Sequence, residues 1–224
     1  MVEEENIIIA AERQPMSDVI SILKSVGAVM TDDHFVYTSG KHGEVYINKD
    51  ALYPHTQQTA AVGKLFAEHC KDMDIETVAA PALGGIILSQ WVAYYLSEMK
   101  GKEIAGVYAE KTPDKSFAFT RGYDQYIKGK KVLVIEDLTT TGGSVKTIVD
   151  VVRAAGGNVV AVGVMVNRDP THVNSEMMGA PFFALGELEA KAWDEKDLPP
   201  EVAARPINTK VGHGAKYLAA QKKA

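Results

Sequence analysis

The sequence contains little cysteine, no excess of basic residues and no long apolar run. Its single cysteine, Cys70, excludes a disulfide bond within the chain and fits a reducing compartment. Lys and Arg number 24 against 29 Asp and Glu, and this net charge of −5 argues against a general nucleic-acid binder. The longest apolar stretches, such as residues 159–166, are far too short to span a bilayer.

The first residues also lack the features of a signal peptide. Met1-Val2-Glu3-Glu4-Glu5-Asn6 is acidic, with neither a basic start nor an apolar core. We therefore expect a cytoplasmic protein with no membrane partner and no nucleic-acid partner.

Several enzyme motifs are missing as well. The chain has no Gly-x-x-x-x-Gly-Lys-Ser/Thr loop, and its six histidines include no His-Glu-x-x-His spacing. The sequence therefore indicates neither a P-loop nucleotide site nor a zinc site of that kind.

Apolar strands alternate with helical segments along the middle of the chain. Residues 77–80, 104–109, 131–135 and 158–166 have the pattern of buried strands. Helical spacing covers residues 56–70, 86–99 and 144–155 between them. This alternation predicts an α/β fold with a parallel twisted sheet flanked by helices. Residues 110–128 are poor in aliphatic side chains and predict a long exposed loop or an irregular hairpin.

One segment carries most of the chemistry. Apolar residues 132–135 lead into Glu136 and Asp137, and the loop that follows is rich in Thr and Gly. The loop residues are Thr139, Thr140, Thr141, Gly142, Gly143 and Ser144. Glycine amides, hydroxyl groups and the start of the next helix suit a phosphate group, and the two acids suit a ribose diol or Mg²⁺. The competing interpretation is a plain turn with a helix cap.

This segment resembles the phosphoribosylpyrophosphate motif of type I phosphoribosyltransferases. The resemblance implies that residues 139–144 bind the 5-phosphate of 5-phosphoribosyl-1-pyrophosphate (PRPP). It also implies that Glu136 and Asp137 face the ribose hydroxyls, with Asp137 near the reacting centre as a catalytic residue.

Further segments resemble the orotate phosphoribosyltransferases within that family. Residues 39–41 and 46–48 are similar to their amino-terminal substrate segment, which makes Lys41 a candidate ligand. Gly84 and Gly85 lie in a segment similar to their pyrophosphate loop. Arg168 stands where the family has an arginine on the orotate side of the site, and an arginine fork suits a carboxylate or carbonyl edge.

Residues 110–122 resemble the mobile catalytic loop of these enzymes. Lys111 and Arg121 are its candidate catalytic cations, and Lys115 is a further candidate substrate ligand. A solvated basic loop without a role is the alternative. The sequence departs from the family at Gly84 and Thr38, where many members have lysine, and it lacks the usual loop histidine.

The resemblance covers most of the chain and implies a single phosphoribosyltransferase domain of residues 1–224. Its core would span about residues 56–170, with a small hood from residues 1–55 and 171–224. PRPP and orotate would be the substrates, Mg²⁺ would be bound mainly through PRPP, and the protein would form a homodimer. The alternatives are a purine or another pyrimidine as the base, or a regulator that senses PRPP without catalysis.

Overall fold

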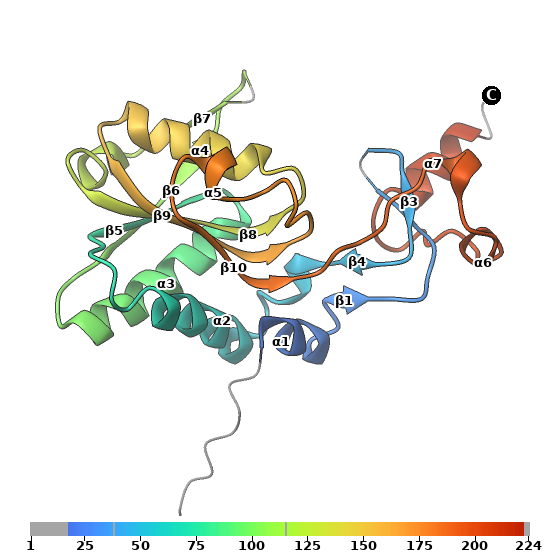
Figure 1. Cartoon of the computed structure of the whole chain (residues 1–224), viewed down its shortest axis with the longest axis horizontal. Helices are drawn as coiled ribbons and strands as arrows, with labels where there is room; N and C mark the ends of the chain where they lie inside the picture. Colours follow the sequence, from blue (N-terminus) through green and yellow to red (C-terminus); the bar gives the residue numbers. More distant parts are fainter. Residues whose placement is uncertain (1–17, 38, 115, 222–224) are drawn as a thin grey trace, which may run out of the picture.

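A mostly parallel sheet covered on both faces forms the larger part of the molecule (Figure 1). The computed structural model describes residues 18–221 except residues 38 and 115. The sheet has six strands in the order β10-β9-β8-β5-β6-β7, and only the β6–β7 pair is antiparallel. The strands are β5 (Thr77–Pro81), β6 (Ala105–Lys111), β7 (Phe117–Ala118), β8 (Lys131–Thr139), β9 (Asn158–Asn167) and β10 (Phe182–Glu187). The predicted parallel α/β sheet is confirmed.

Helices cover both faces of this sheet, which explains the near-continuous apolar runs in its central strands. One face carries α1 (Val19–Ser25), α2 (Thr56–His69) and α3 (Gly84–Lys100), and the other carries α4 (Gly143–Ala154) and α5 (Ser175–Met178) (Figure 1). Two buried clusters fill these interfaces, with Phe66 and Leu88 in the first and Ile148 and Val149 in the second.

The element bounds differ from the sequence expectations in two places. Helix α3 begins at Gly84 and not at Ile86. Strand β10 lies beyond residue 170, so part of the segment expected to form the hood completes the main sheet. No residue of β10 is fully buried, and its strand signal in the sequence is correspondingly weak.

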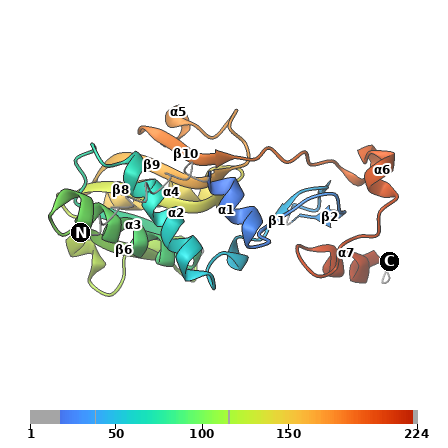
Figure 2. The same ribbon diagram turned by 90° about the horizontal axis from the view of Figure 1, so that it is seen from below.

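A smaller layer stands beside the carboxyl edge of the sheet, and we call it the hood (residues 28–53 and 188–221). It contains β1 (Val29–Met30) paired with β4 (Tyr46–Ile47), β2 (Phe35–Val36) paired with β3 (His42–Gly43), and the short helices η1 (Lys49–Ala51), η3 (Glu195–Asp197), α6 (Pro200–Ala203) and α7 (Gly214–Gln221). Single bridges join His34 to Ile207 and His42 to Trp193. An N-terminal and a C-terminal segment of the described chain therefore build this layer together, as Figures 1 and 2 show.

The segment predicted to be a loop or irregular hairpin is a hairpin. β6 continues into residue 111 and returns as β7, after which η2 (Tyr123–Tyr126) leads back to β8. None of the helices in the described part of the chain is long and apolar enough to cross a membrane.

Candidate active site

The carboxyl end of β8 places Asp137 at the junction between the sheet and the hood. Asp137 is 1% exposed, and its Oδ2 accepts hydrogen bonds from Lys49 Nζ at 2.6 Å and from Tyr53 OH at 2.8 Å. Both donors come from η1 and the residues just after it. A buried carboxylate needs such partners, so this pair fixes the acid and ties the hood to the sheet.

Gly84 allows a second loop to reach the same carboxylate. A β-carbon at residue 84 would lie 1.8 Å from Asp137 Oδ2 and 2.9 Å from Lys49 Nζ. The preceding peptide bond, Ala82–Leu83, is cis. A lysine at position 84 would displace Asp137 in this arrangement, so the glycine fits the packing here.

The charges around Asp137 are arranged to keep Lys49 protonated. Burial lowers the pKa of Lys49, but the neighbouring Asp137 carboxylate outweighs it and the net pKa is raised. Burial, with the charge of Asp137 added, raises the pKa of Tyr53, which stays a neutral donor. Glu136 is 7% exposed, and burial together with Asp137 raises its pKa to about 8.

The loop between β8 and α4 turns back on itself to start the helix. Thr139 Oγ1 accepts from Gly142 N at 3.1 Å, and Gly142 has a φ of +74° with Met177 packed where a β-carbon would lie. Helix α4 begins at Gly143, directly after this turn. The loop therefore presents hydroxyl groups and a helix N-terminus on one surface, which is the arrangement that binds phosphate.

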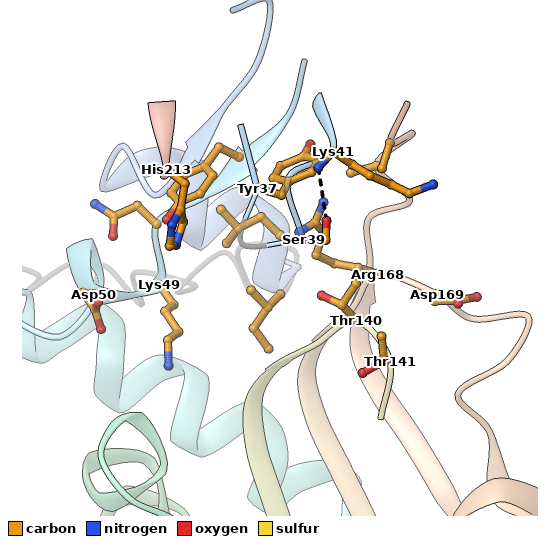
Figure 3. Close-up of a pocket in the computed structure, with 16 residues that line it drawn as sticks. Tyr37, Ser39, Lys41, Lys49, Asp50, Thr140, Thr141, Arg168, Asp169 and His213 are labelled. Carbon is orange, nitrogen blue, oxygen red and sulfur yellow. Dashed lines mark hydrogen bonds between the residues drawn. The ribbon is translucent and has the colours of Figure 1, made fainter. Parts of the chain in front are cut away.

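A cavity of about 690 Å³ separates this loop from the hood. Figure 3 shows the side chains that line it. The lining residues are Tyr37, Ser39, Lys41, Tyr46, Ile47, Asn48, Lys49, Asp50, Leu138, Thr140, Thr141, Arg168, Asp169, Ala190, Ala192 and His213. The cavity thus joins the Thr- and Gly-rich loop to residues from both halves of the hood.

Arg168 enters this cavity from the residue after β9. Its Cζ lies 4.9 Å from the ring centroid of Tyr37, and its backbone N donates to Thr139 O at 2.9 Å. Its Nε is buried and has no hydrogen-bond partner within the described residues. A guanidinium held over an aromatic ring beside a cavity is suited to the edge of a planar ligand that offers hydrogen-bond acceptors.

The chain is similar in sequence to a known protein family and to several of its members. The Phosphoribosyl transferase domain family matches residues 48–178, more than half of the chain. Orotate phosphoribosyltransferase of Thermotoga maritima is 37% identical over 179 residues, which cover 80% of this chain and 89% of the relative. The chain belongs to the phosphoribosyltransferase family.

Solved structures of other phosphoribosyltransferases share the fold. Orotate phosphoribosyltransferase of Mycobacterium tuberculosis in complex with Fe(III) dicitrate aligns with a TM-score of 0.62 at 24% identity, over 77% of this chain and 97% of that one. The complex of that enzyme with PRPP aligns with a TM-score of 0.58 at 24% identity, over 77% and 97% of the two chains. These likenesses agree with the type I phosphoribosyltransferase fold expected from the motif.

The structure brings most of the predicted site residues together. Thr140, Thr141, Lys41 and Arg168 line the cavity, and Lys41 also forms an ion pair with Asp194 at 3.6 Å. Gly84 reaches Asp137, and Gly85 follows it at the start of α3, where a β-carbon would lie 2.6 Å from Ala80 Cβ.

Two of the predicted loop cations, Lys111 and Arg121, do not line the cavity. Lys111 is exposed at the end of β6, and Arg121 pairs with Glu110 at 3.0 Å, with its backbone φ at +62°. Lys115 lies outside the described residues, as does Thr38.

Sequence reasoning missed the two partners of Asp137 and one wall of the cavity. Lys49 directly follows residues 46–48, which resemble the substrate segment, so that resemblance extended by one residue would have included it. Tyr53 and His213 had no such signal. Their roles depend on contacts between segments that are far apart in the chain, such as the 84 residues that separate Tyr53 from Asp137.

Proposed function

We propose that this phosphoribosyltransferase transfers the phosphoribosyl group of PRPP to orotate, giving orotidine 5′-phosphate and pyrophosphate. The observation that carries the proposal is one cavity that joins the Thr- and Gly-rich loop to Arg168, with Lys49 in its lining bonded to Asp137. Relatives named orotate phosphoribosyltransferase, at 37% identity in Thermotoga maritima, favour orotate over another base.

Each part of PRPP has a counterpart in the site. We place the 5-phosphate on residues 139–144, where hydroxyl groups and the start of α4 converge. Glu136 and Asp137 then face the ribose hydroxyls. The leaving pyrophosphate lies toward Gly84 and Gly85, near the Lys49 ammonium, which offsets part of its charge.

The base completes the arrangement from the hood side. A ring nitrogen of orotate attacks the anomeric carbon, and the bond from that carbon to the pyrophosphate oxygen breaks with its electron pair on the pyrophosphate. The proton of the attacking N–H group passes to the leaving pyrophosphate or to solvent. Arg168, supported by Tyr37, binds the oxygen-rich edge of orotate and holds the attacking nitrogen in line.

The site suits a Mg²⁺ ion that binds mainly through PRPP. The described residues contain no group of three or more His, Cys, Asp or Glu able to hold a metal ion, and Asp137 is already bonded to Lys49 and Tyr53. Mg²⁺ usually retains several water ligands and binds through few carboxylates together with substrate phosphates, so PRPP itself would supply most of its ligands here. Bound to pyrophosphate, it would neutralise the charge of the leaving group.

We propose that Lys111, Lys115 and Arg121 act only when the β6–β7 hairpin moves toward bound substrate. The exposed Arg121–Glu110 pair is of the kind that contributes little to stability, so it presents a small barrier to such a change. The hairpin would then exclude water and stabilise the leaving group.

We further propose a homodimer and a cytoplasmic location. Helix α3 and the residue before it expose Leu83 at 83%, Ile87 at 39% and Tyr94 at 53%, an apolar surface suited to a second copy of the chain. Sedimentation velocity at micromolar concentration tests this, and a monomer would contradict it. We propose that the whole chain acts as one phosphoribosyltransferase domain.

The decisive experiment is a panel of bases. The purified protein is incubated with PRPP, Mg²⁺ and either orotate, uracil, adenine or hypoxanthine, and pyrophosphate release and nucleotide formation are measured. We expect rapid turnover with orotate alone. Faster turnover with a purine would replace the base assignment, and binding of PRPP without turnover on any base would support a sensor.

A further inference from the structure

The C-terminal segment supplies a wall of the cavity that neither the phosphate loop nor Arg168 provides. Ala190, Ala192 and His213 all come from the chain after β10, and His213 is the only ionisable side chain among the three. In Figure 3, His213 is drawn on the opposite side of the lining residues from Arg168 and Thr141, on the same side of the view as Lys49.

The segment that carries His213 is fixed by backbone contacts to β2 and the residue before it. His213 N donates to Val36 O at 2.9 Å, and Asn208 N donates to His34 O at 2.7 Å. Gly212 has a φ of +72°, and a β-carbon there would lie 2.9 Å from Val36 O. The chain can pass this close to β2 because residue 212 is glycine.

The Asn208 side chain holds the turn between these two anchors. Its Nδ2 donates to Asp33 Oδ2 at 2.7 Å, and its Oδ1 accepts from Lys210 N at 2.8 Å and Val211 N at 3.0 Å. Helix α7 starts immediately after His213, and a β-carbon at Gly214 would lie 2.1 Å from Asn208 O. The position of His213 is therefore set on both sides along the chain.

We propose that His213 is a specificity-determining residue that donates a hydrogen bond to the acceptor base. The inference rests on the proposed function, because orotate carries carboxylate and carbonyl oxygens at several positions around its ring. Arg168 engages one oxygen edge from the β9 side, and the His213 imidazole engages another from the hood. Lys49, which also lines the cavity, is paired with Asp137 and does not compete for this bond.

The test separates binding of the base from binding of PRPP. Steady-state KM values for orotate and PRPP, and kcat, are measured for wild type, His213→Ala and His213→Asn. A lost hydrogen bond to a charged acceptor predicts a rise of at least about tenfold in the KM for orotate in His213→Ala. The KM for PRPP stays within about twofold, since only the base contact is removed, and His213→Asn, which keeps a donor, loses less.

Two further variants distinguish a ligand contact from a structural role. Lys216→Ala alters an exposed side chain three residues further on and serves as the matched control, with all constants unchanged. Asn208→Ala loosens the turn and raises the KM for orotate by a smaller factor than His213→Ala. Melting temperatures of all variants are recorded in parallel.

An unchanged KM for orotate in His213→Ala would overturn the proposal, as would equal rises in both KM values. If both His213 variants lose their fold while Lys216→Ala keeps it, the residue is structural and the proposal fails. If wild type turns over another base and not orotate, the proposed function fails. The change in KM for that base between wild type and His213→Ala, compared with the change in KM for PRPP, then decides the role of His213 separately.

Discussion

The sheet side and the hood side of the cavity are built in different ways. On the sheet side, Glu136 to Ser144 form one continuous segment whose geometry follows from a strand, a tight turn and a helix start. On the hood side, contacts join residues as far apart as Asp33 and Asn208, separated by 175 positions. The sheet side therefore depends on local backbone conformation, whereas the hood depends on contacts between two segments that are far apart in the sequence.

The buried ionisable groups of the two sides also differ. The sheet side buries a carboxyl group, Glu136, whose pKa rises to about 8. The hood buries His34 and His42, joined Nε2 to Nδ1 at 2.7 Å, and the pKa of His42 is lowered by burial and by the charge of His34. Acid and base are thus both pushed toward their neutral forms, with opposite consequences for stability as pH changes.

The largest effect is expected on the sheet side, from Asp137→Asn. The amide keeps the shape of the side chain but removes the charge that faces the ribose and balances Lys49. We expect kcat/KM to fall by roughly 10²–10³-fold. Steady-state kinetics with PRPP and orotate measure the loss, and circular dichroism checks that the fold is intact.

Asp72→Asn is the matched control for this variant, because Asp72 is exposed and far from the cavity in the chain. It should retain full activity. Near-normal turnover in Asp137→Asn would remove Asp137 from the mechanism and leave the Lys49 pair as a structural contact between sheet and hood.

A smaller loss is expected where the two sides meet, at Arg168. In Arg168→Lys the positive charge remains, but the planar fork and its packing against Tyr37 are lost. The KM for orotate should rise roughly tenfold while PRPP binding, followed by calorimetry, is preserved. Arg153→Lys, on the outer part of α4, is the control. A rise in the dissociation constant for PRPP in Arg168→Lys would mean that Arg168 binds PRPP and would contradict its assignment to orotate.

The same contrast explains what the sequence could predict. The β8 strand, the acid pair and the Thr- and Gly-rich loop are contiguous, and apolar periodicity together with turn chemistry identifies them. Lys49 and Tyr53 could not be assigned to Asp137, because no local pattern specifies a contact across 88 or 84 residues. β10 was missed because its half-buried residues have no clear alternation. Arg121 was expected at the site, yet in the structure its guanidinium pairs with Glu110.

A pH-dependent stability test sharpens the contrast on the sheet side. The ordinary pKa of Glu136 is 4.5 and its folded value is about 8, so the folded state holds the extra proton between these values and stability falls as pH rises through them. Glu136→Gln removes this dependence. At pH 8.5 the free energy of unfolding of the variant should exceed that of wild type by on the order of 2 kcal/mol, and this difference should become smaller toward pH 5.

Urea unfolding at a series of pH values measures this difference. Glu98→Gln, an exposed carboxyl on α3, is the control and should follow wild type at every pH. Parallel curves for wild type and Glu136→Gln would show that Glu136 is ionised in the folded protein at neutral pH.

The hood should respond in the opposite direction and more weakly. Because the folded pKa of His42 lies below its ordinary 6.5, the unfolded chain binds the proton more readily, and stability present above pH 6.5 is lost as pH falls. Charged and titratable groups around it are His34, Glu195 and Tyr217.

The variant His42→Phe removes this titrating group. Between pH 7.5 and 5.5, its free energy of unfolding should fall less than that of wild type, by no more than about 1 kcal/mol, whatever the effect of the substitution at neutral pH. Melting curves of His42→Phe and of the exposed control His55→Gln decide the matter. If His42→Phe loses as much stability on acidification as the control, the His34–His42 pair does not govern the acid response of the hood, and the opposition between the two sides of the cavity fails there.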